Sequence, residues 1–270
     1  MTVTKPGRWA LSPELVAPEF RRAARAITVL FPFWDGSGKV TYRLGRSWRF
    51  GEYSVAGSWT VGPRGTAYSL VGQHNDLWTA SSRTPSMGGD VEWSMFLSLN
   101  RTGSYGSEIY ASFRTSATLA DGQWFLRENG DNVDLSLRAS GGWQTVTWTA
   151  PGTAAGGQQD IVVTRKQGGI YELFLNGVSK GTQTNASSIG ISAAQRLVIH
   201  QLFATDPNHG IDGTFQFYAQ FNRALSANDV ALLSRDPYGL IRQYVPVELY
   251  GTGAAVDAVN RTNIIFVAAN

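Results

Sequence analysis

The chain has 270 residues, and charged side chains make up only 16% of them, against about 25% in an average soluble domain. It contains 30 Gly and 9 Trp but no Cys. The absence of Cys excludes disulfides, thiolate metal sites, iron–sulfur clusters and a cysteine nucleophile. Few charges, many glycines and many aromatic residues disfavour a coiled coil, a helical bundle or a disordered chain, and favour strands separated by tight turns.

The formal net charge of +3 is unevenly distributed along the chain. Residues 1–64 hold ten basic and four acidic side chains, a net charge of +6, whereas residues 65–270 carry a net charge of −3. Nineteen of the 23 basic residues are Arg, which is preferred over Lys where a planar guanidinium pairs or stacks at an interface. A genome rich in G and C explains the same excess equally well.

Residues 1–27 are predicted to form an N-terminal arm that carries two short helices. Pro13 and Pro18 are each followed by Glu, which is typical of the first turn of a helix. The second helix is expected to extend through residues 20–25. Its arginines are expected to form a solvated or partner-facing surface rather than a nucleic-acid site.

From about Ile27 the sequence alternates between strand-like and turn-like segments. Apolar positions alternate with polar ones in 91–99, 133–138 and 215–221, so that the odd-numbered residues of each segment are expected to share one face. Asn176–Gly177 is the strongest hairpin signal, because both residue types tolerate positive φ. Strands at this spacing predict a sandwich or barrel, and one-sided alternation predicts an antiparallel sheet packed on one face only.

One helix is predicted after the last long strand, followed by a C-terminal arm. Ser226 and Asp229 have the spacing of a capping box, and Pro237 is expected to end the helix. Beyond residue 240, a Gly- and Ala-rich stretch at 251–255 leads to the apolar stretch 264–267. We therefore expect residues 241–270 to form a second arm that docks on a partner.

Two segments resemble the laminin-G-like, concanavalin A-like jelly rolls. Residues 170–182 are similar to the family's Asn-Gly-Val hairpin, and residues 210–230 resemble its closing strand and the Asn-Arg-Ala-Leu-Ser segment that leads into a short helix. Residues 33–38 and 69–76 are more loosely similar to its opening segments. The resemblance implies an all-β fold, an antiparallel jelly-roll sandwich over residues 28–240 with one short C-terminal helix and extended terminal arms.

Residues 234–241 and 244–247 resemble the end of such domains in structural proteins of tailed bacteriophages. The sequence has no apolar leader after Met1 and no run of about 18 apolar residues that would span a membrane. The expectation from the resemblance is therefore a chain that is made in a bacterial host cytoplasm and built into a virion.

A glycosidase of this fold would need two carboxylates about 5–9.5 Å apart on either side of the sugar bond. The densest acidic cluster, Glu128, Asp131 and Asp134, surrounds an Asn-Gly turn, so its acids are expected to point away from one another. The sequence has no Gly-x-Ser-x-Gly elbow and no Walker loop. We therefore expect no catalytic residues and no enzymatic activity.

The resemblance also implies a rim site for Ca²⁺ or a glycan, built from hard oxygen ligands. The candidate ligands are Gln73, Asn75, Asp76, Asp206, Asn208 and Asp212. The alternative is that these residues cap turns. The three His are scattered, so a His metal site is not expected, and Ca²⁺ is the single cofactor left open.

Exposed aromatic residues beside polar groups are typical of sugar sites, and Trp143 and Trp148 have opposite strand parity. If residues 143–149 form a strand, one of the two is therefore exposed, with core or interface packing as the alternative for each. The negative charge of residues 65–270 argues against a direct nucleic-acid partner.

The leading hypothesis is a non-enzymatic virion structural protein of a tailed bacteriophage, either a capsid-surface decoration or a tail-associated accessory protein. Its arms would hold capsid or tail subunits in a homo-oligomer, so that deletion of residues 1–26 or 251–270 would leave a folded chain that no longer joins the particle. The predicted partner-binding residues are Arg8, Trp9, Arg21, Arg22, Arg25, Ile264, Ile265, Phe266 and Val267. The alternative is a lectin-like, Ca²⁺-dependent adhesin for host glycan, and a glycosidase is a weaker third. No membrane partner is expected.

Overall fold

The computed structural model describes thirteen segments of the chain, and the statements below concern these residues. They are residues 13–31, 40–43, 46–54, 58–70, 75–79, 91–103, 107–113, 123–139, 142–149, 151–152, 156–185, 197–199 and 212–242. Most of the predicted C-terminal arm and the first twelve residues of the N-terminal arm lie outside them.

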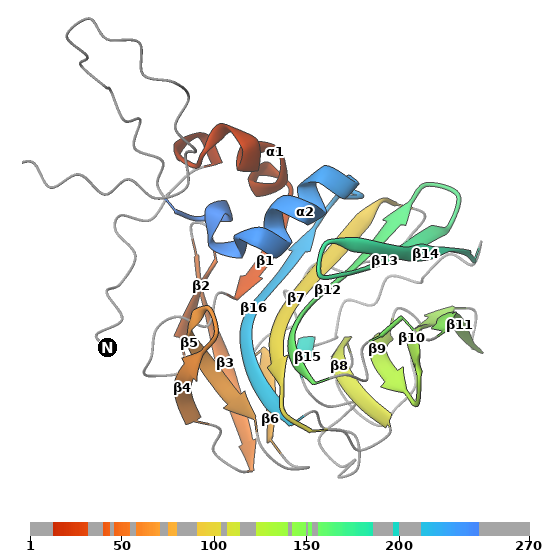
Figure 1. The fold of residues 1–270 in the computed structure, drawn as a ribbon, viewed down its shortest axis with the longest axis horizontal. Helices are drawn as coiled ribbons and strands as arrows, with labels where there is room; N and C mark the ends of the chain where they lie inside the picture. The colour runs from red at the N-terminus through yellow and green to blue at the C-terminus, as the bar shows by residue number, and fades with distance from the viewer. Residues whose placement is uncertain are drawn as a thin grey trace, which may run out of the picture.

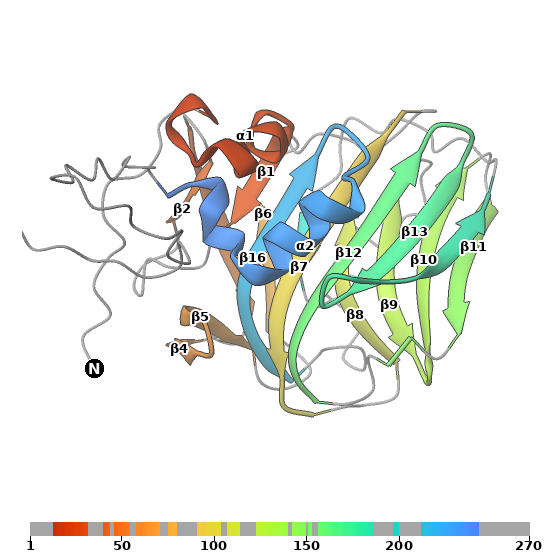
Figure 2. The ribbon, with the colours of Figure 1, turned by 45° about the horizontal axis from the view of Figure 1, so that its top comes forward.

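The described strands form two eight-stranded sheets in which every pair is antiparallel (Figures 1 and 2). The first sheet has the order β14-β13-β12-β7-β16-β5-β4, with β1 also paired to β16. Its strands are β14 (Val178–Thr184), β13 (Ile170–Leu175), β12 (Gly157–Lys166), β7 (Trp93–Arg101), β16 (Gly213–Phe221), β5 (Gly65–Leu70), β4 (Ser58–Gly62) and β1 (Ile27–Phe31).

The second sheet has the order β11-β10-β9-β8-β15-β6-β3-β2. Its strands are β11 (Gly142–Thr149), β10 (Asn132–Ala139), β9 (Trp124–Asn129), β8 (Ser107–Phe113), β15 (Leu197–Ile199), β6 (Asn75–Thr79), β3 (Arg46–Ser54) and β2 (Val40–Arg43). The two sheets stack into a sandwich, and this confirms the predicted all-β, concanavalin A-like architecture.

The hairpin between β13 and β14 turns at Asn176 and Gly177, as predicted. Their φ angles are 51° and 81°, the positive values that a two-residue mirror-image turn requires. Asn176 is the one non-Gly residue with positive φ in the described part of the chain. The turn between β9 and β10 likewise has Gly130 at a φ of 60°.

The main core lies between the two sheets and contains the large aromatic side chains. Trp93 comes from the first sheet, and Trp124 and Trp148 come from the second. The indole Nε1 of Trp148 donates a hydrogen bond to the Gly181 carbonyl at 3.0 Å, so this buried polar group has a partner. Val91, predicted on the same face as Trp93, instead precedes β7 and is 52% exposed.

A second core covers the other face of the first sheet. It packs Phe96, Val162 and Phe174 under α1 (Pro18–Arg25) and α2 (Ala227–Arg235), with the 3-10 helices η1 (Pro13–Leu15) and η2 (Pro237–Leu240) beside them (Figure 2). The prediction of a sheet packed on one face only is therefore wrong for this sheet. Among the described residues, no helix is long and apolar enough to cross a membrane.

Ser94 is a polar residue of the alternating segment, yet it is buried in β7. Its hydroxyl donates to the Arg223 carbonyl and accepts from the Leu225 amide, each at 2.9 Å. A small hydroxyl that is fully hydrogen-bonded can be buried at little cost. The side chain therefore marks a link to the chain that enters α2, not a solvent-exposed face.

A bulge in β16 changes which side chains face the main core. The register of β16 with β7 shifts between Phe215 and Phe217, so Phe215 and Tyr218 face the main core while Phe217 and Phe221 face the helices. The prediction that Phe215 and Phe217 share a face is wrong. One inserted residue moves every following side chain to the opposite face of a strand.

The predicted helix start at Pro18 is confirmed, but residues 13–27 pack on their own sandwich. Val16 and Phe20 are buried in the second core, and the Phe20 ring lies where a Cβ on Gly239 would stand. Apolar side chains at helical spacing give this segment one apolar face, which packs on the sandwich. The α2 helix has the predicted capping box, with Ser226 and Asp229 each bonding the other's amide.

Candidate functional site

Strands β9, β10 and β11 turn one row of side chains away from the main core. Their apolar residues fill the core, so strand periodicity forces the intervening residues onto the other side. In the register of the three strands, Asp134 lies between Arg127 and Thr147, and Arg138 lies beside Trp143. We call this surface the β9–β11 face; it comprises Phe125, Arg127, Asp134, Ser136, Arg138, Trp143, Thr145 and Thr147.

Two aromatic rings form the apolar part of the β9–β11 face. Trp143 is half-buried, and its ring packs edge-to-face on Phe125 with centroids 5.0 Å apart. The Arg138 guanidinium lies 5.8 Å from the Trp143 ring centroid, and the Arg127 guanidinium lies 5.4 Å from that of Phe125. Each guanidinium lies within cation–π distance of its ring.

Next to the rings is a row of hydrogen-bonding groups centred on Asp134. Its carboxylate accepts from Thr147 Oγ1 at 2.7 Å, Arg127 Nη2 at 3.2 Å and Asn129 Nδ2 at 3.4 Å. One row along, the hydroxyls of Ser136 and Thr145 lie 3.0 Å apart. Asp134 and Ser136 are 5% and 2% exposed. The groups of the two rows that a sugar hydroxyl could reach are therefore the exposed Thr145 and Thr147, beside the half-buried ring of Trp143.

A second group of acids lies inside the sandwich. Arg101 pairs with Glu128 at 2.7 Å and Glu108 at 2.9 Å, and the Tyr110 hydroxyl donates to Glu128 at 2.7 Å. Burial alone would lower the pKa of Arg101, but its hydrogen bond to Glu128 and the charge of Glu108 outweigh burial and raise that pKa. These side chains are almost fully buried, so they join the sheets rather than face a substrate.

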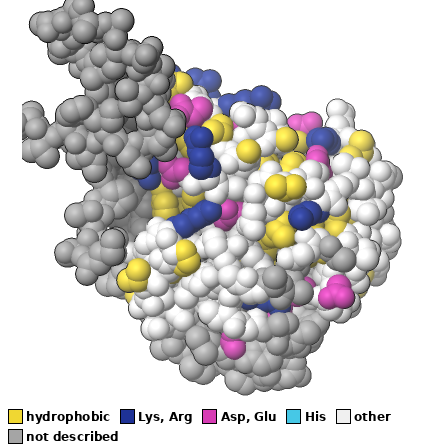
Figure 3. Space-filling view, in the orientation of Figure 1, with side chains coloured by type: hydrophobic (Ala, Val, Ile, Leu, Met, Phe, Trp, Pro, Cys, Tyr) yellow, Lys and Arg dark blue, Asp and Glu magenta, His cyan; other side chains and the backbone are white. Residues whose placement is uncertain are grey.

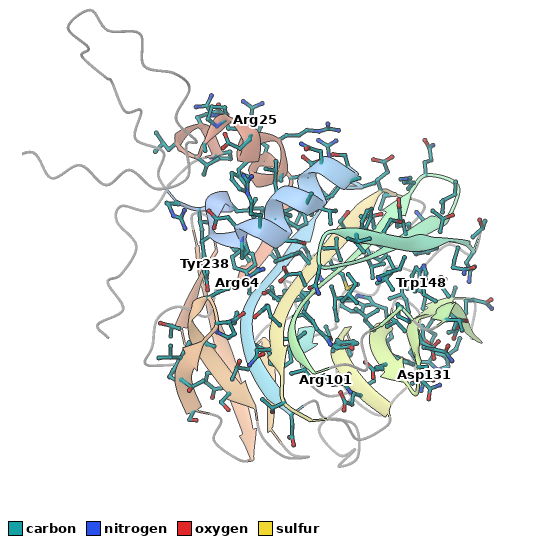
Figure 4. All side chains as sticks on the ribbon, in the orientation of Figure 1. Arg25, Arg64, Arg101, Asp131, Trp148 and Tyr238 are labelled. Carbon is teal, nitrogen blue, oxygen red and sulfur yellow. The ribbon has the colours of Figure 1, made fainter. Side chains whose placement is uncertain are left out.

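The predicted divergence of the acidic cluster at 128–134 is confirmed. Glu128 points between the sheets, Asp134 points out on the β9–β11 face, and Asp131 is exposed in the turn between β9 and β10. Figure 4 shows Asp131 at the edge of the sheet, with Trp148 inside. The three carboxylates therefore do not share a site.

Of the predicted rim ligands, the structure describes the side chain of Asp212 alone. Gln73, Asp206 and Asn208 lie outside the described residues, and for Asn75 and Asp76 only the backbone, at the start of β6, is described. The Asp212 carbonyl accepts from the Thr102 amide at 2.8 Å, next to Gly103. In the described part of the chain, no three His, Cys, Asp or Glu side chains could hold a metal ion, and the Ca²⁺ site stays a prediction.

The predicted arm residues separate into two sets. Arg21, Arg22 and Arg25 lie on α1, whereas Arg8, Trp9 and residues 264–267 lie outside the described residues. The α1 arginines line a groove together with Arg223, which the sequence analysis did not associate with them. The two positions are almost 200 residues apart, and no local pattern could have joined them.

Residues 79–231 match the model of the concanavalin A-like lectin/glucanases superfamily, a match to more than half of the chain. The chain belongs to this superfamily. A comparison with curated proteins gives no match.

Several solved structures share the superfamily fold of this chain. The binding domain of botulinum neurotoxin serotype D is 10% identical, with a TM-score of 0.61 over 81% of this chain and 53% of that chain. The binding domain of Paraclostridial Mosquitocidal Protein 1 is also 10% identical, with a TM-score of 0.61 over 80% and 53%. A serotype D ligand binding domain in complex with N-acetylneuraminic acid is 11% identical, with a TM-score of 0.59 over 78% and 51%. The chain thus spans about half the length of these structures.

The predicted opposition of Trp143 and Trp148 is confirmed: Trp148 is 2% exposed in the main core, and Trp143 is half-buried on the other side of β11. The sequence analysis missed Phe125 and Arg127 as neighbours of Trp143. The signal that could have found them is strand pairing, because the register of β9, β10 and β11 places residues 125, 136 and 145 side by side.

Proposed function

We propose that this chain is a carbohydrate-binding, lectin-like module that holds a glycan on the β9–β11 face. The observation that carries the proposal is the half-buried Trp143 ring beside the hydrogen-bonded row around Asp134. Membership of a superfamily that includes lectins, and the binding-domain titles of the similar structures, support it. Of the three functions considered from sequence, these observations favour the carbohydrate-binding alternative.

In the proposed complex the apolar face of a sugar ring stacks on Trp143. Hydroxyls of the same or the next sugar then reach Thr145, Thr147 and the guanidinium of Arg138. The Asp134 carboxylate is held by its three donors before any ligand arrives. Little side-chain freedom would be lost on binding, which lowers the entropic cost of the complex.

The first test replaces Trp143 by Ala and measures glycan affinity by titration calorimetry, after an array has selected the ligand. Trp59→Ala is the matched control, because Trp59 is also partly exposed but lies on β4 of the first sheet, against Tyr68. We expect Trp143→Ala to weaken binding at least about tenfold, or ~1.4 kcal/mol, and Trp59→Ala to leave it unchanged. Equal affinity of wild type and Trp143→Ala would exclude the β9–β11 face.

We further propose that binding occurs without catalysis. Glycosidases of the common type use a pair of carboxylates. Asp134 is the one carboxylate of the β9–β11 face as defined above, and Glu108 and Glu128 are bound to Arg101 inside the sandwich. No reducing sugar should be released from the bound glycan over a day. Release of reducing sugar that disappears in Asp134→Asn would overturn the proposal that binding occurs without catalysis.

A virion role is the second proposal and rests on the resemblance of residues 234–247 to phage structural proteins. The deletion of residues 1–26 that the sequence analysis suggested would also remove Val16 and Phe20, which are buried in the second core. A shorter deletion is therefore needed. Deleting residues 1–12 or 251–270 spares that core. Under this proposal both truncated chains fold, shown by thermal unfolding, yet fail to co-sediment with particles. Normal incorporation of both would exclude it.

A further inference from the structure

A groove lined by arginines lies at the end of the molecule distant from the turn between β9 and β10. Its volume is about 520 Å³, within the roughly 300–1,000 Å³ typical of small-ligand sites. We call it the arginine groove; it is lined by Pro18, Arg21, Arg22, Arg25, Ala26, Asn222 and Arg223. Figure 4 shows Arg25 on α1, well separated from Asp131, and Figure 3 shows basic side chains along the same edge.

The walls of the arginine groove are fixed to the sandwich. One wall is α1, whose Phe20 is buried in the second core, and the other is the chain that leaves β16. The Asn222 amide donates to the Ala26 carbonyl at 2.9 Å and ties the two walls together. The four guanidinium groups are therefore carried on a preformed scaffold and not on a free arm.

Among the described residues, three of the four groove arginines have no acidic partner. Arg25 pairs with Glu14 through two bonds of 3.0 and 2.9 Å. The Nε of Arg21 donates to the Val16 carbonyl, and among the described residues Arg21, Arg22 and Arg223 form no ion pair. Like charges gathered without counter-charge repel one another, and an anion relieves that repulsion.

The lining indicates which anion fits. Guanidinium groups pair bidentately with carboxylate, sulfate or phosphate oxygens. None of the described residues that line the groove is aromatic, which disfavours the stacking of single-stranded nucleic acid. Among the same described residues, Pro18 and Ala26 are the apolar ones, and these small side chains offer no pocket for the apolar anchors of a protein partner. Recognition would rest on charge alone.

We propose that the arginine groove is a second binding site, which takes the carboxylate or sulfate groups of an acidic polysaccharide. The choice of a polysaccharide rests on the proposed carbohydrate-binding function, whereas the choice of an anion rests on the groove. An acidic glycan chain bound here is held by its charged groups, and the β9–β11 face remains free for a neutral sugar.

The test compares two double variants that remove the same charge. Arg22→Gln with Arg223→Gln changes the groove, and Lys180→Gln with Arg235→Gln changes exposed positions on β14 and α2. The probes are heparin, polygalacturonate and neutral dextran, measured by calorimetry on the full chain at low salt. We expect the groove variant to bind both acidic polymers at least about tenfold more weakly, and the control to match wild type.

Three outcomes would overturn the proposal: equal loss in both double variants, no loss in the groove variant, or equally groove-dependent binding of polyglutamate or single-stranded DNA. Trp143→Ala separates the two sites. Loss of neutral glycan binding in Trp143→Ala with heparin binding retained supports both proposals. If Trp143→Ala still binds the neutral glycan, only the proposed function is contradicted. The heparin affinity of the groove variant then still tests the arginine groove.

Discussion

The outward faces of the two sheets differ in what covers them. On the first sheet, Phe96, Val162 and Phe217 point outward and are buried under α1 and α2. On the β9–β11 face, outward positions hold Thr, Ser, Asp and Arg around the half-buried Trp143. A strand that is apolar on both sides needs a second cover, and here amphipathic segments before the first strand and after the last supply it. A strand with a polar outer side needs no second apolar cover.

The largest expected effect comes from uncovering the first sheet. Phe20→Ala removes a ring that is 5% exposed, and we expect a loss of about 3–5 kcal/mol in the free energy of unfolding, measured with urea. The control is Leu15→Ala, in η1, because Leu15 is 42% exposed and should change stability by less than about 1 kcal/mol. Equal losses would mean that α1 does not cover the sheet.

Two tyrosines, Tyr238 beside the helices and Tyr218 in the main core, should also make the protein sensitive to alkali. Burial raises the pKa of Tyr238 to about 12 and raises that of Tyr218 further. The folded state therefore favours the protonated phenols, and this stabilisation is complete below about pH 10 and is lost as the pH rises toward 12. Each tyrosine contributes at most ~1.4 kcal/mol per pH unit.

The measurement is the free energy of unfolding in urea at pH values from about 8 to about 11.5, in steps of roughly half a pH unit. We expect Tyr238→Phe to fall less steeply with pH than wild type. The comparison with wild type isolates the contribution of the Tyr238 hydroxyl. Identical slopes would contradict burial of the Tyr238 hydroxyl.

A smaller effect is expected at the start of α2. Ser226→Ala removes the side-chain acceptor for the Asp229 amide, and loss of such a cap destabilises a protein by about 1 kcal/mol. Asn228→Ala, at an exposed position inside the same helix, is the control and should be neutral or slightly stabilising. Thermal unfolding separates the two, and equal effects would argue against the capping box.

The smallest expected effect on stability is at the β9–β11 face. Trp143→Ala should lower the free energy of unfolding by less than about 1 kcal/mol, because the ring is partly exposed. Trp148→Ala, on the same strand with the opposite parity, should lower it by about 3–5 kcal/mol. Similar losses in urea titrations would show that Trp143 is a core residue and weaken its role as a sugar platform.

The features that sequence predicted correctly are local. Asn176–Gly177 adopts positive φ, Ser226 and Asp229 form their capping box, and Pro18 begins a helix. Trp143 and Trp148 take opposite faces because side chains on a strand alternate. Each of these depends on backbone preferences within a few residues, which the amino-acid types alone express.

The features that sequence could not predict depend on contacts between distant segments. The bulge at Phe215–Phe217, the buried Arg101 with its two glutamates and the meeting of Arg223 with the α1 arginines require the assembled sheets. The sequence by itself determined the sandwich, its turns and its helix ends. Only the tertiary structure decided that the helices cover the outer face of the first sheet. The reason is that helices pack where a sheet offers apolar surface to bury, and that surface exists only once the strands are paired.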